Sequence, residues 1–329
     1  MIVLYTMIYF TIIVCLLGAA QGFRLVQFNV EWLFMNYYAP AKCPGSGCPW
    51  NNETESSTHF NYIAKVVDTL NPDIMNLCEV EGIDELNLLK SRMGNAAYTA
   101  NLIPGTDTST GQNVGLLTKP EWLPILPLYR TEERVAYPLA GSSCGYTGAN
   151  GTVGVSKHYL TEFVLYDRQV LMVAAHLLAY PEDPTRCAER EAQAQVLQKY
   201  IVEYLKTRES AEVIVLGDFN DFDGTVVDAN GNLPTSRVLD ILKGQTGSES
   251  GEYLLKSAAE WIPTAERYTD WWDENGNGVS SPDEFSMIDH VLLTPGLFEK
   301  IRGVWVYHGY TEYAGKYDSD HYPVVVDFV

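Results

Sequence analysis

Basic residues are scarce in this chain of 329 residues. Its 22 lysines and arginines stand against 42 aspartates and glutamates, which gives a formal net charge of −20. Such a surface repels polyanions at long range and therefore excludes a stable, electrostatically held complex with nucleic acid. It does not exclude an enzyme that cleaves phosphodiesters, because bound divalent cations can supply the missing positive charge.

Internal repeats are also missing, as are Pro/Gly/Ser-rich tracts long enough to separate domains. The composition is 46% hydrophobic and 12% aromatic, enough to bury a sizeable core. We therefore expect one domain, residues 23–329.

Charged side chains are absent from residues 1–22, which are mostly apolar. Met7 to Leu17 has the character of a signal-peptide core, and small residues precede a cut near Gln21 or Gly22. The prediction is a cleaved signal peptide and a secreted protein, or one of the secretory and endolysosomal lumen. The alternative is an uncleaved membrane anchor, because the usual positive flank is missing. Membrane contact is expected only if this segment is retained.

Cysteines are few, and five of the six remain once Cys15 leaves with the signal peptide. Cys78 lies within a hydrophobic strand and is expected to be a buried free thiol. The other four lie in loops or at a helix start and could form two local disulfides in an oxidising compartment. The predicted pairs are Cys43 with Cys48 and Cys144 with Cys187. Two sequons, at Asn52 and Asn150, predict a glycoprotein.

Hydrophobic strands and amphipathic helices alternate along the chain, which predicts an α/β or α+β fold with a substantial sheet core. The expected strands are Arg24 to Val30, Asp73 to Cys78, Val114 to Thr118, Phe163 to Leu165, Val170 to Ala175, Val213 to Leu216, Met287 to Leu293, Val304 to His308 and Pro323 to Phe328. The expected helices are Thr58 to Leu70, Ile83 to Leu89 and one that starts at Asp183-Pro184. Residues 132–155 are expected to form a long surface excursion.

Polar side chains that bind hard cations or move protons stand at the ends of these strands. Such groups beside a core strand are costly unless they are paired or bind something. Their recurrence predicts one shared site rather than unrelated strand ends. The residues are Asn29, Glu31, Glu79, His176, Asp218, Asn220, Asp289, Asp320 and His321.

The same residues carry a family resemblance. Phe28-Asn29-Val30-Glu31, Pro72-Asp73-Ile74 with Glu79, His176-Leu177, Gly217-Asp218-Phe219-Asn220, Ile288-Asp289-His290 and Ser319-Asp320-His321 follow in this order. Together, from Phe23 to Val329, they resemble the deoxyribonuclease-like endonuclease/exonuclease/phosphatase superfamily. The resemblance implies a four-layer αββα sandwich of two packed, mostly antiparallel or mixed sheets flanked by helices.

The resemblance also implies roles. Glu79 would be the main Mg²⁺ (or Mn²⁺) ligand with Asn29 beside it, and Glu31 and Asp320 join the metal candidates. Asp218 and Asn220 would orient water and phosphate, His321 polarised by Asp289 would act at the phosphate, and His176 would act from the other side. The general base stays open between Asp218 and His321.

The chain departs from the family pattern in places. Deoxyribonuclease-like members pair the histidine matching His176 with a glutamate, where this chain offers Asn113. Lys157 is a second candidate for contact with substrate. Position 31 is Glu where abasic-site endonucleases have Asp. Asp221 follows Asn220, which favours a nuclease-like enzyme over an inositol phosphatase.

A second metal site is predicted in residues 273–284, which match the spacing of an EF-hand calcium loop. Its candidate ligands are Asp273, Asn275, Asn277, Val279, Ser281 and Glu284. Ser280 and Pro282 are unusual for such a loop, and the alternative is an acidic turn without metal. Any calcium here is expected to be structural.

The function predicted from the sequence is that of a secreted, divalent-metal-dependent phosphodiesterase, most readily an endonuclease. Nucleic acid would bind transiently to a monomer. One alternative is a sphingomyelinase-like phospholipid phosphodiesterase. The other is a catalytically silent calcium-binding or recognition protein on the same fold.

Overall fold

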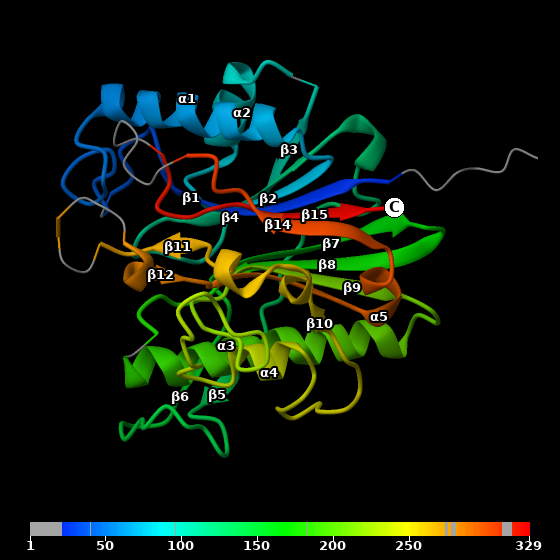
Figure 1. Ribbon diagram of the computed structural model, residues 1–329. Coiled ribbons are helices and arrows are strands. Elements are labelled where there is room, and N and C mark those ends of the chain that lie inside the picture. Colours follow the sequence, from blue (N-terminus) through cyan, green and yellow to red (C-terminus); the bar gives the residue numbers. More distant parts are fainter. Residues whose placement is uncertain are drawn as a thin grey trace, which may run out of the picture.

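Two β-sheets pack face to face, and helices cover their outer faces (Figure 1). The computed structural model describes residues 22–39, 41–95, 97–181, 183–273, 276–277, 281–310 and 318–329. The mixed α/β architecture expected from the sequence, a helix–sheet–sheet–helix sandwich, is confirmed. Residues 1–21, which hold almost all of the predicted signal peptide or anchor, lie outside the described part. Within that part, none of the helices combines the length and the apolar character that crossing a membrane requires.

The first sheet has six strands in the order β14-β15-β1-β2-β4-β3. Its strands are β1 (Arg24–Leu33), β2 (Ile74–Val80), β3 (Thr99–Leu102), β4 (Asn113–Thr118), β14 (Ile301–Val306) and β15 (Val324–Phe328). β1 and β2 are parallel, and the other neighbours are antiparallel. The carboxyl ends of β1 and β2 therefore meet at one edge of the sheet.

The second sheet has five strands in the order β10-β13-β9-β8-β7. Its strands are β7 (Lys157–Leu165), β8 (Arg168–His176), β9 (Glu212–Asp218), β10 (Lys256–Ser257) and β13 (Asp289–Leu293). Here β8 and β9 form the parallel pair, and all other pairings are antiparallel. Each sheet thus has one central parallel pair whose carboxyl ends lie side by side.

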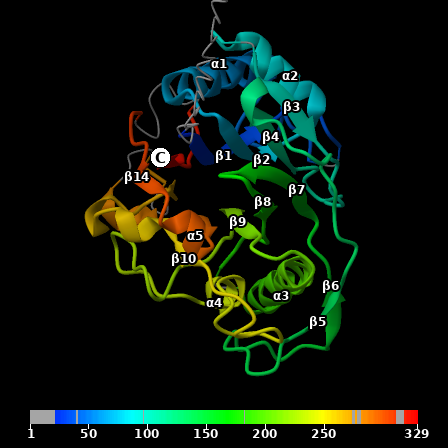
Figure 2. The ribbon, with the colours of Figure 1, turned by 90° about the vertical axis from the view of Figure 1, so that its right-hand side faces the viewer.

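Helices α1 (Glu53–Leu70) and α2 (Ile83–Arg92) cover the first sheet, whereas α3 (Pro184–Lys206) and α4 (Val238–Leu242) cover the second (Figure 2). α1 begins five residues before the predicted Thr58, because the Asn52 side chain accepts hydrogen bonds from the backbone NH groups of Thr54 and Glu55. Short elements complete the fold. They are α5 (Pro295–Phe298), β5 (Val135–Tyr137), β6 (Gly151–Val153), β11 (Asp270–Trp271), β12 (Phe285–Ser286) and the 3₁₀ turns η1 (Pro120–Trp122), η2 (Ala258–Trp261), η3 (Thr264–Glu266) and η4 (Pro282–Glu284).

The main core lies between the two sheets, where alternate residues of facing strands pack together. Leu25, Ile74, Met172, Leu216 and Val326 are among its fully buried members. Two further clusters join each sheet to its helices. This packing holds the two sheets together and fixes the distance between side chains that project from their ends.

Both predicted disulfides are present. Cys43 and Cys48 close a short loop, with Cα atoms 5.3 Å apart. Cys144 joins the surface excursion to Cys187 at the start of α3 over a separation of 43 residues. Cys78 is a buried free thiol, as expected.

Candidate active site

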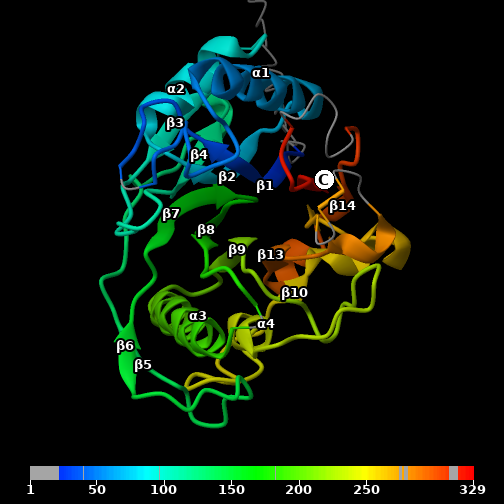
Figure 3. The ribbon, with the colours of Figure 1, turned by 90° about the vertical axis from the view of Figure 1, so that its left-hand side faces the viewer.

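The polar residues predicted to form one site gather where the two parallel pairs end. Asn29 lies in β1 where its bulge begins, Glu79 is the last residue but one of β2, and His176 and Asp218 are the last residues of β8 and β9. This is the end of the sandwich that faces the viewer in Figure 3, and β11 and β12 flank it at the left of Figure 1. Both sheets therefore contribute to one cluster.

The backbone is irregular at this end, which the strand alternation did not predict. Glu31, Glu79 and Asn220 have left-handed φ values of 47°, 66° and 51°. The β1–β2 register shifts between Asn29 and Leu33, and the β2–β4 register shifts between Cys78 and Val80. Left-handed φ is uncommon for non-glycine residues and recurs at functional sites. The irregular backbone at these positions changes the direction in which the side chains of Glu31, Glu79 and Asn220 project from the strand ends.

Asn29 links the two sheets. Its amide Nδ2 donates to Glu79 Oε1 at 3.3 Å and to Asp218 Oδ2 at 3.0 Å. Its Oδ1 accepts from the backbone NH of Glu31 at 3.1 Å. In this arrangement Asn29 bridges two carboxylates as a donor, and ligation of a metal through its oxygen would require the amide to rotate. Ligation by Asn29 stays a prediction.

His321 is held by carboxylates on both sides of its ring. Nδ1 lies 2.7 Å from Asp289 Oδ2, and Nε2 lies 3.5 Å from Asp270 Oδ1. Burial alone would lower the pKa of His321, but Asp289 and Asp270 outweigh it and raise that pKa well above its usual value. The two carboxylates therefore favour the charged form of the ring. Asp270 was not found by the sequence analysis, because β11 is only two residues long and gives no strand pattern.

Buried carboxylates accumulate at this edge. Burial, reinforced by Asp289, raises the pKa of Asp218 to about 8. Burial also raises the pKa of Asp320 to about 7, and the Glu31 pKa is raised well above normal by burial, Asp320 and Glu79. The backbone NH of Asp320 donates to Glu31 Oε2 at 3.1 Å. Asp218, Asp289 and His321 offer ligand atoms that all lie within 4.8 Å of one another. The carboxylates gathered at this edge are hard oxygen donors that fit a divalent cation, which would relieve the crowding of like charges.

His176 and Lys157 lie side by side, both buried. Lys157 Nζ is 3.4 Å from His176 Nε2 and donates to Gln112 Oε1 at 3.1 Å. The structure does not bring Asn113 to His176: its Oδ1 accepts from the backbone NH of Gly105, and its Nδ2 donates to backbone carbonyls. Lys157, which also contacts Gln112, is the side chain that lies next to His176 in place of Asn113.

The remaining predicted residue, Asn220, turns toward the second sheet. Its backbone NH donates to Asp218 Oδ1 at 3.0 Å, and its Nδ2 donates to the Leu177 carbonyl at 3.2 Å. His290 points away from the site, and its Nε2 contacts the Asp221 carbonyl.

The predicted calcium loop is described only in part. Asn275 and Val279 lie outside the described residues. Asp273 Oδ1 accepts from the backbone NH of Asn277 at 3.0 Å, and Glu284 Oε2 accepts from the Trp271 indole at 2.9 Å and from the Ser281 NH at 3.2 Å. Calcium binding here stays a prediction.

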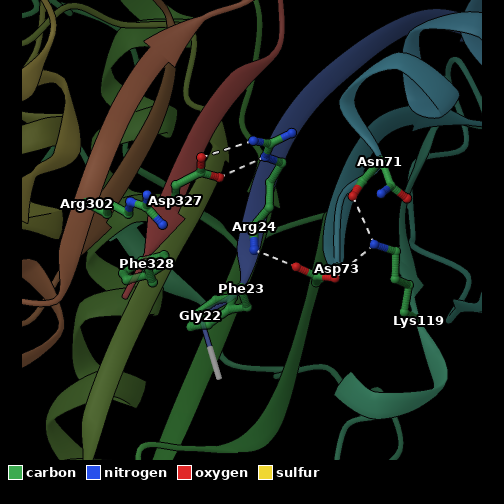
Figure 4. Close-up of a pocket in the computed structure, with 9 residues that line it drawn as sticks. All are labelled: Gly22, Phe23, Arg24, Asn71, Asp73, Lys119, Arg302, Asp327 and Phe328. Carbon is green, nitrogen blue, oxygen red and sulfur yellow. Dashed lines mark hydrogen bonds and ion pairs between the residues drawn. The ribbon is translucent and has the colours of Figure 1, made fainter. Parts of the chain in front are cut away.

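A separate pocket lies at the opposite end of β1 (Figure 4). Two of its cations are paired: Arg24 contacts Asp327 at 2.7 Å, and Lys119 contacts Asp73 at 2.9 Å. None of the predicted site residues lines this pocket.

The sandwich and the cluster of carboxylates, imidazoles and amides at its edge define a class of enzyme, the hydrolases that act on phosphate ester bonds. The sequence profile of the Endonuclease/Exonuclease/phosphatase family matches residues 26–321, and the chain belongs to that family. No curated protein matches the chain in sequence.

Solved structures share the fold at low identity. A truncated TDP2 from Caenorhabditis elegans is 16% identical with a TM-score of 0.54, and the match covers 93% of this chain and 97% of that one. The human Nocturnin catalytic domain is 16% identical with a TM-score of 0.54, covering 94% of each chain. The 3′ phosphatase NExo from Neisseria, bound to product DNA hairpin, is 13% identical with a TM-score of 0.58, covering 93% and 99%.

Proposed function

We propose that this protein is a secreted, divalent-metal-dependent phosphodiesterase that hydrolyses phosphodiester bonds of nucleic acid. The observation that carries the proposal is the junction at Asn29, where Glu79 of one sheet and Asp218 of the other share one amide nitrogen. Close by, His321 is held by Asp289. A catalytically silent binding protein has no need of this combination.

The cation would be held by Glu79 together with Glu31 and Asp320, whose carboxylates crowd one another. When bound, a hard cation such as Mg²⁺ supplies positive charge to the phosphate oxygens and lowers the cost of the charge that develops there. Asn29 spaces Glu79 from Asp218 and keeps their oxygens pointing to a common region.

Proton transfer falls to Asp218 and His321. Asp218 lies in a buried position with two hydrogen bonds to its carboxylate, from Asn29 and from the NH of Asn220, and is suited to take a proton from water. His321 is suited to stabilise negative charge on the phosphate, because its imidazolium is maintained by Asp289 and Asp270. His176 is buried beside Asp218 and would contact the phosphate from the second sheet.

The choice of nucleic acid is supported by two observations. One structural neighbour is a 3′ phosphatase bound to a DNA hairpin. The net charge of −20 suits an enzyme that holds its polyanionic substrate only through the cation-loaded site. Such an enzyme would release its products quickly.

The test is hydrolysis by the purified mature protein with Mg²⁺, Mn²⁺ or Ca²⁺, assayed on DNA, RNA, sphingomyelin and simple phosphomonoesters. We expect cleavage of nucleic acid that requires the metal and is lost in His321→Ala, by roughly 10²- to 10⁴-fold. Cleavage of sphingomyelin alone would instead support the phospholipid phosphodiesterase. No metal-dependent hydrolysis on the whole panel would refute the proposal.

A further inference from the structure

A series of hydrogen-bonded polar side chains crosses the interior beneath the active site. Gln27 on β1 and Asn76 on β2 are paired neighbours in the first sheet, and both are fully buried. Asn76 Nδ2 donates to Gln27 Oε1 at 2.5 Å, and Gln27 Nε2 donates across the sandwich to Asp289 Oδ1 at 3.0 Å. Burying two amides between packed sheets is costly unless they serve each other or another group.

Asp289, the last residue in this series of hydrogen bonds, fixes the orientation of the Gln27 amide. Asp289 Oδ1 accepts from Gln27 Nε2, so the Gln27 amide turns its nitrogen toward this carboxylate. The Gln27 oxygen then faces the Asn76 nitrogen. Rotation of the Gln27 amide would place its oxygen against Asp289 Oδ1, which is repulsive.

Each oxygen of Asp289 therefore has its own donor. Oδ1 accepts a hydrogen bond from Gln27 Nε2 of the opposite sheet, and Oδ2 lies 2.7 Å from His321 Nδ1. A carboxylate with one bond of this kind could rotate about its terminal torsion. The second bond removes that freedom and sets the plane in which His321 is held.

From this geometry we infer that Gln27 is a positioning residue for the catalytic histidine, acting through Asp289. The role rests on the proposed function of His321. Gln27 does not touch the substrate. It anchors the Asp289–His321 pair of the second sheet to the first sheet, where Asn29 and Glu79 lie.

The test replaces Gln27 with methionine, which has similar length and no hydrogen-bonding amide. We expect kcat to fall by about 10- to 100-fold with KM unchanged, the usual effect of losing such a supporting hydrogen bond. In an Asp289→Ala background the same Gln27→Met change should cost nothing further, because its only route to His321 is gone. An equal loss in both backgrounds would overturn the inference.

A matched control separates positioning from general destabilisation. Gln198 on α3 is also fully buried, and its Nε2 donates to the carbonyls of Ile241 at 2.9 Å and Thr246 at 2.6 Å. Gln198→Met should lower the melting temperature in the manner of Gln27→Met and leave kcat unchanged. If it lowers kcat equally, Gln27 is structural only.

Proton NMR of His321 tests the inference without turnover, and therefore without knowledge of the substrate. The Nδ1 proton of His321, held by a carboxylate, should give a protected downfield proton resonance that is absent from His321→Ala. Gln27→Met should shift or broaden this resonance, and Gln198→Met should not. An unchanged resonance in Gln27→Met would refute the role even if no substrate is hydrolysed.

Discussion

His176 and Asp218 are direct partners in the parallel pair β8–β9, and His176 Nε2 lies 3.6 Å from Asp218 Oδ2. Lys157 is the partner of His176 on the other side, so cation, imidazole and carboxylate stand in register on three adjacent strands. Burial, with Lys157 and His321 adding to it, lowers the pKa of His176 well below its usual value. The pKa values of the two active-site histidines are thus shifted in opposite directions, that of His176 down and that of His321 up.

The first prediction concerns His176. We expect His176→Asn to lower kcat by roughly 10²-fold, the lower end of the range for a group acting in proton transfer or phosphate stabilisation. Steady-state kinetics on the substrate identified above would measure it. His158→Asn is the matched control, because His158 is also buried on β7 but contacts the Val155 carbonyl outside the site. Comparable losses in both variants would show that His176 acts through stability alone.

The second prediction concerns pH and metal. The folded, metal-free protein holds protons on Asp218 and Asp320 up to about pH 8 and about pH 7, and on His321 above its ordinary pKa. In the unfolded chain Asp218 and Asp320 have released their protons by pH 6.5, and His321 loses its proton around that pH. Stability should therefore fall as pH rises from about 6.5 to 8, since the folded state binds more protons over that window. Thermal melts in EDTA would measure it.

Magnesium should reverse this trend, because ionised carboxylates bind it and protonated ones do not. The increase in melting temperature on adding Mg²⁺ should be larger at pH 8 than at pH 6.5, and Glu79→Gln should weaken Mg²⁺ binding by at least about 10-fold. Asp218→Asn should flatten the pH dependence of the metal-free protein. A Mg²⁺ effect independent of pH would contradict the prediction.

The third prediction concerns the disulfides. The Cys144–Cys187 bond closes a loop of 43 residues, whereas Cys43–Cys48 closes one of 5. Longer loops restrict the unfolded chain more, so Cys144→Ala with Cys187→Ala should destabilise the fold by about 2–4 kcal/mol and the other pair by less. Urea unfolding of the two double variants would compare them. A larger loss for the short loop would show that local packing dominates.

The fourth prediction separates two roles of Asn52, which is exposed and caps α1. Thr54→Ala removes the sequon and keeps the cap, whereas Asn52→Ala removes both. On expression through a secretory pathway, both variants should lose one glycan by gel mobility. Only Asn52→Ala should lose the further ~1 kcal/mol of a helix cap when both proteins are deglycosylated before unfolding. Equal stability of the two would argue against the cap.

Much of the fold was predictable, because long strands and capped helices carry strong periodic patterns. The helix at Asp183-Pro184, the strand that ends at Asp218 and the strand that begins at Asp289 lie where expected. The short strands β3, β5, β6, β10, β11 and β12 were missed, since two to four residues cannot establish a period of two. The surface excursion at 132–155 contains two of them.

The site was predicted as a set of residues but not as a geometry. Residues at strand ends were identified because the polar groups stand out against apolar strands. Gln27 and Asp270 were not identified: one lies mid-strand, where a single polar residue has many explanations, and the other follows no recognisable element. The Lys157–His176 contact also depends on pairing between strands, which no local pattern encodes.

Because Asn29 and Glu79 project from one sheet and His176, Asp218 and Asp289 from the other, the spacing of the reactive groups depends on the distance between the two sheets. Leu25, Ile74, Met172 and Leu216 act as spacers for a reaction that they never touch. A change in their summed volume would alter turnover while leaving every polar residue in place. Selection on catalysis therefore extends into the apolar core.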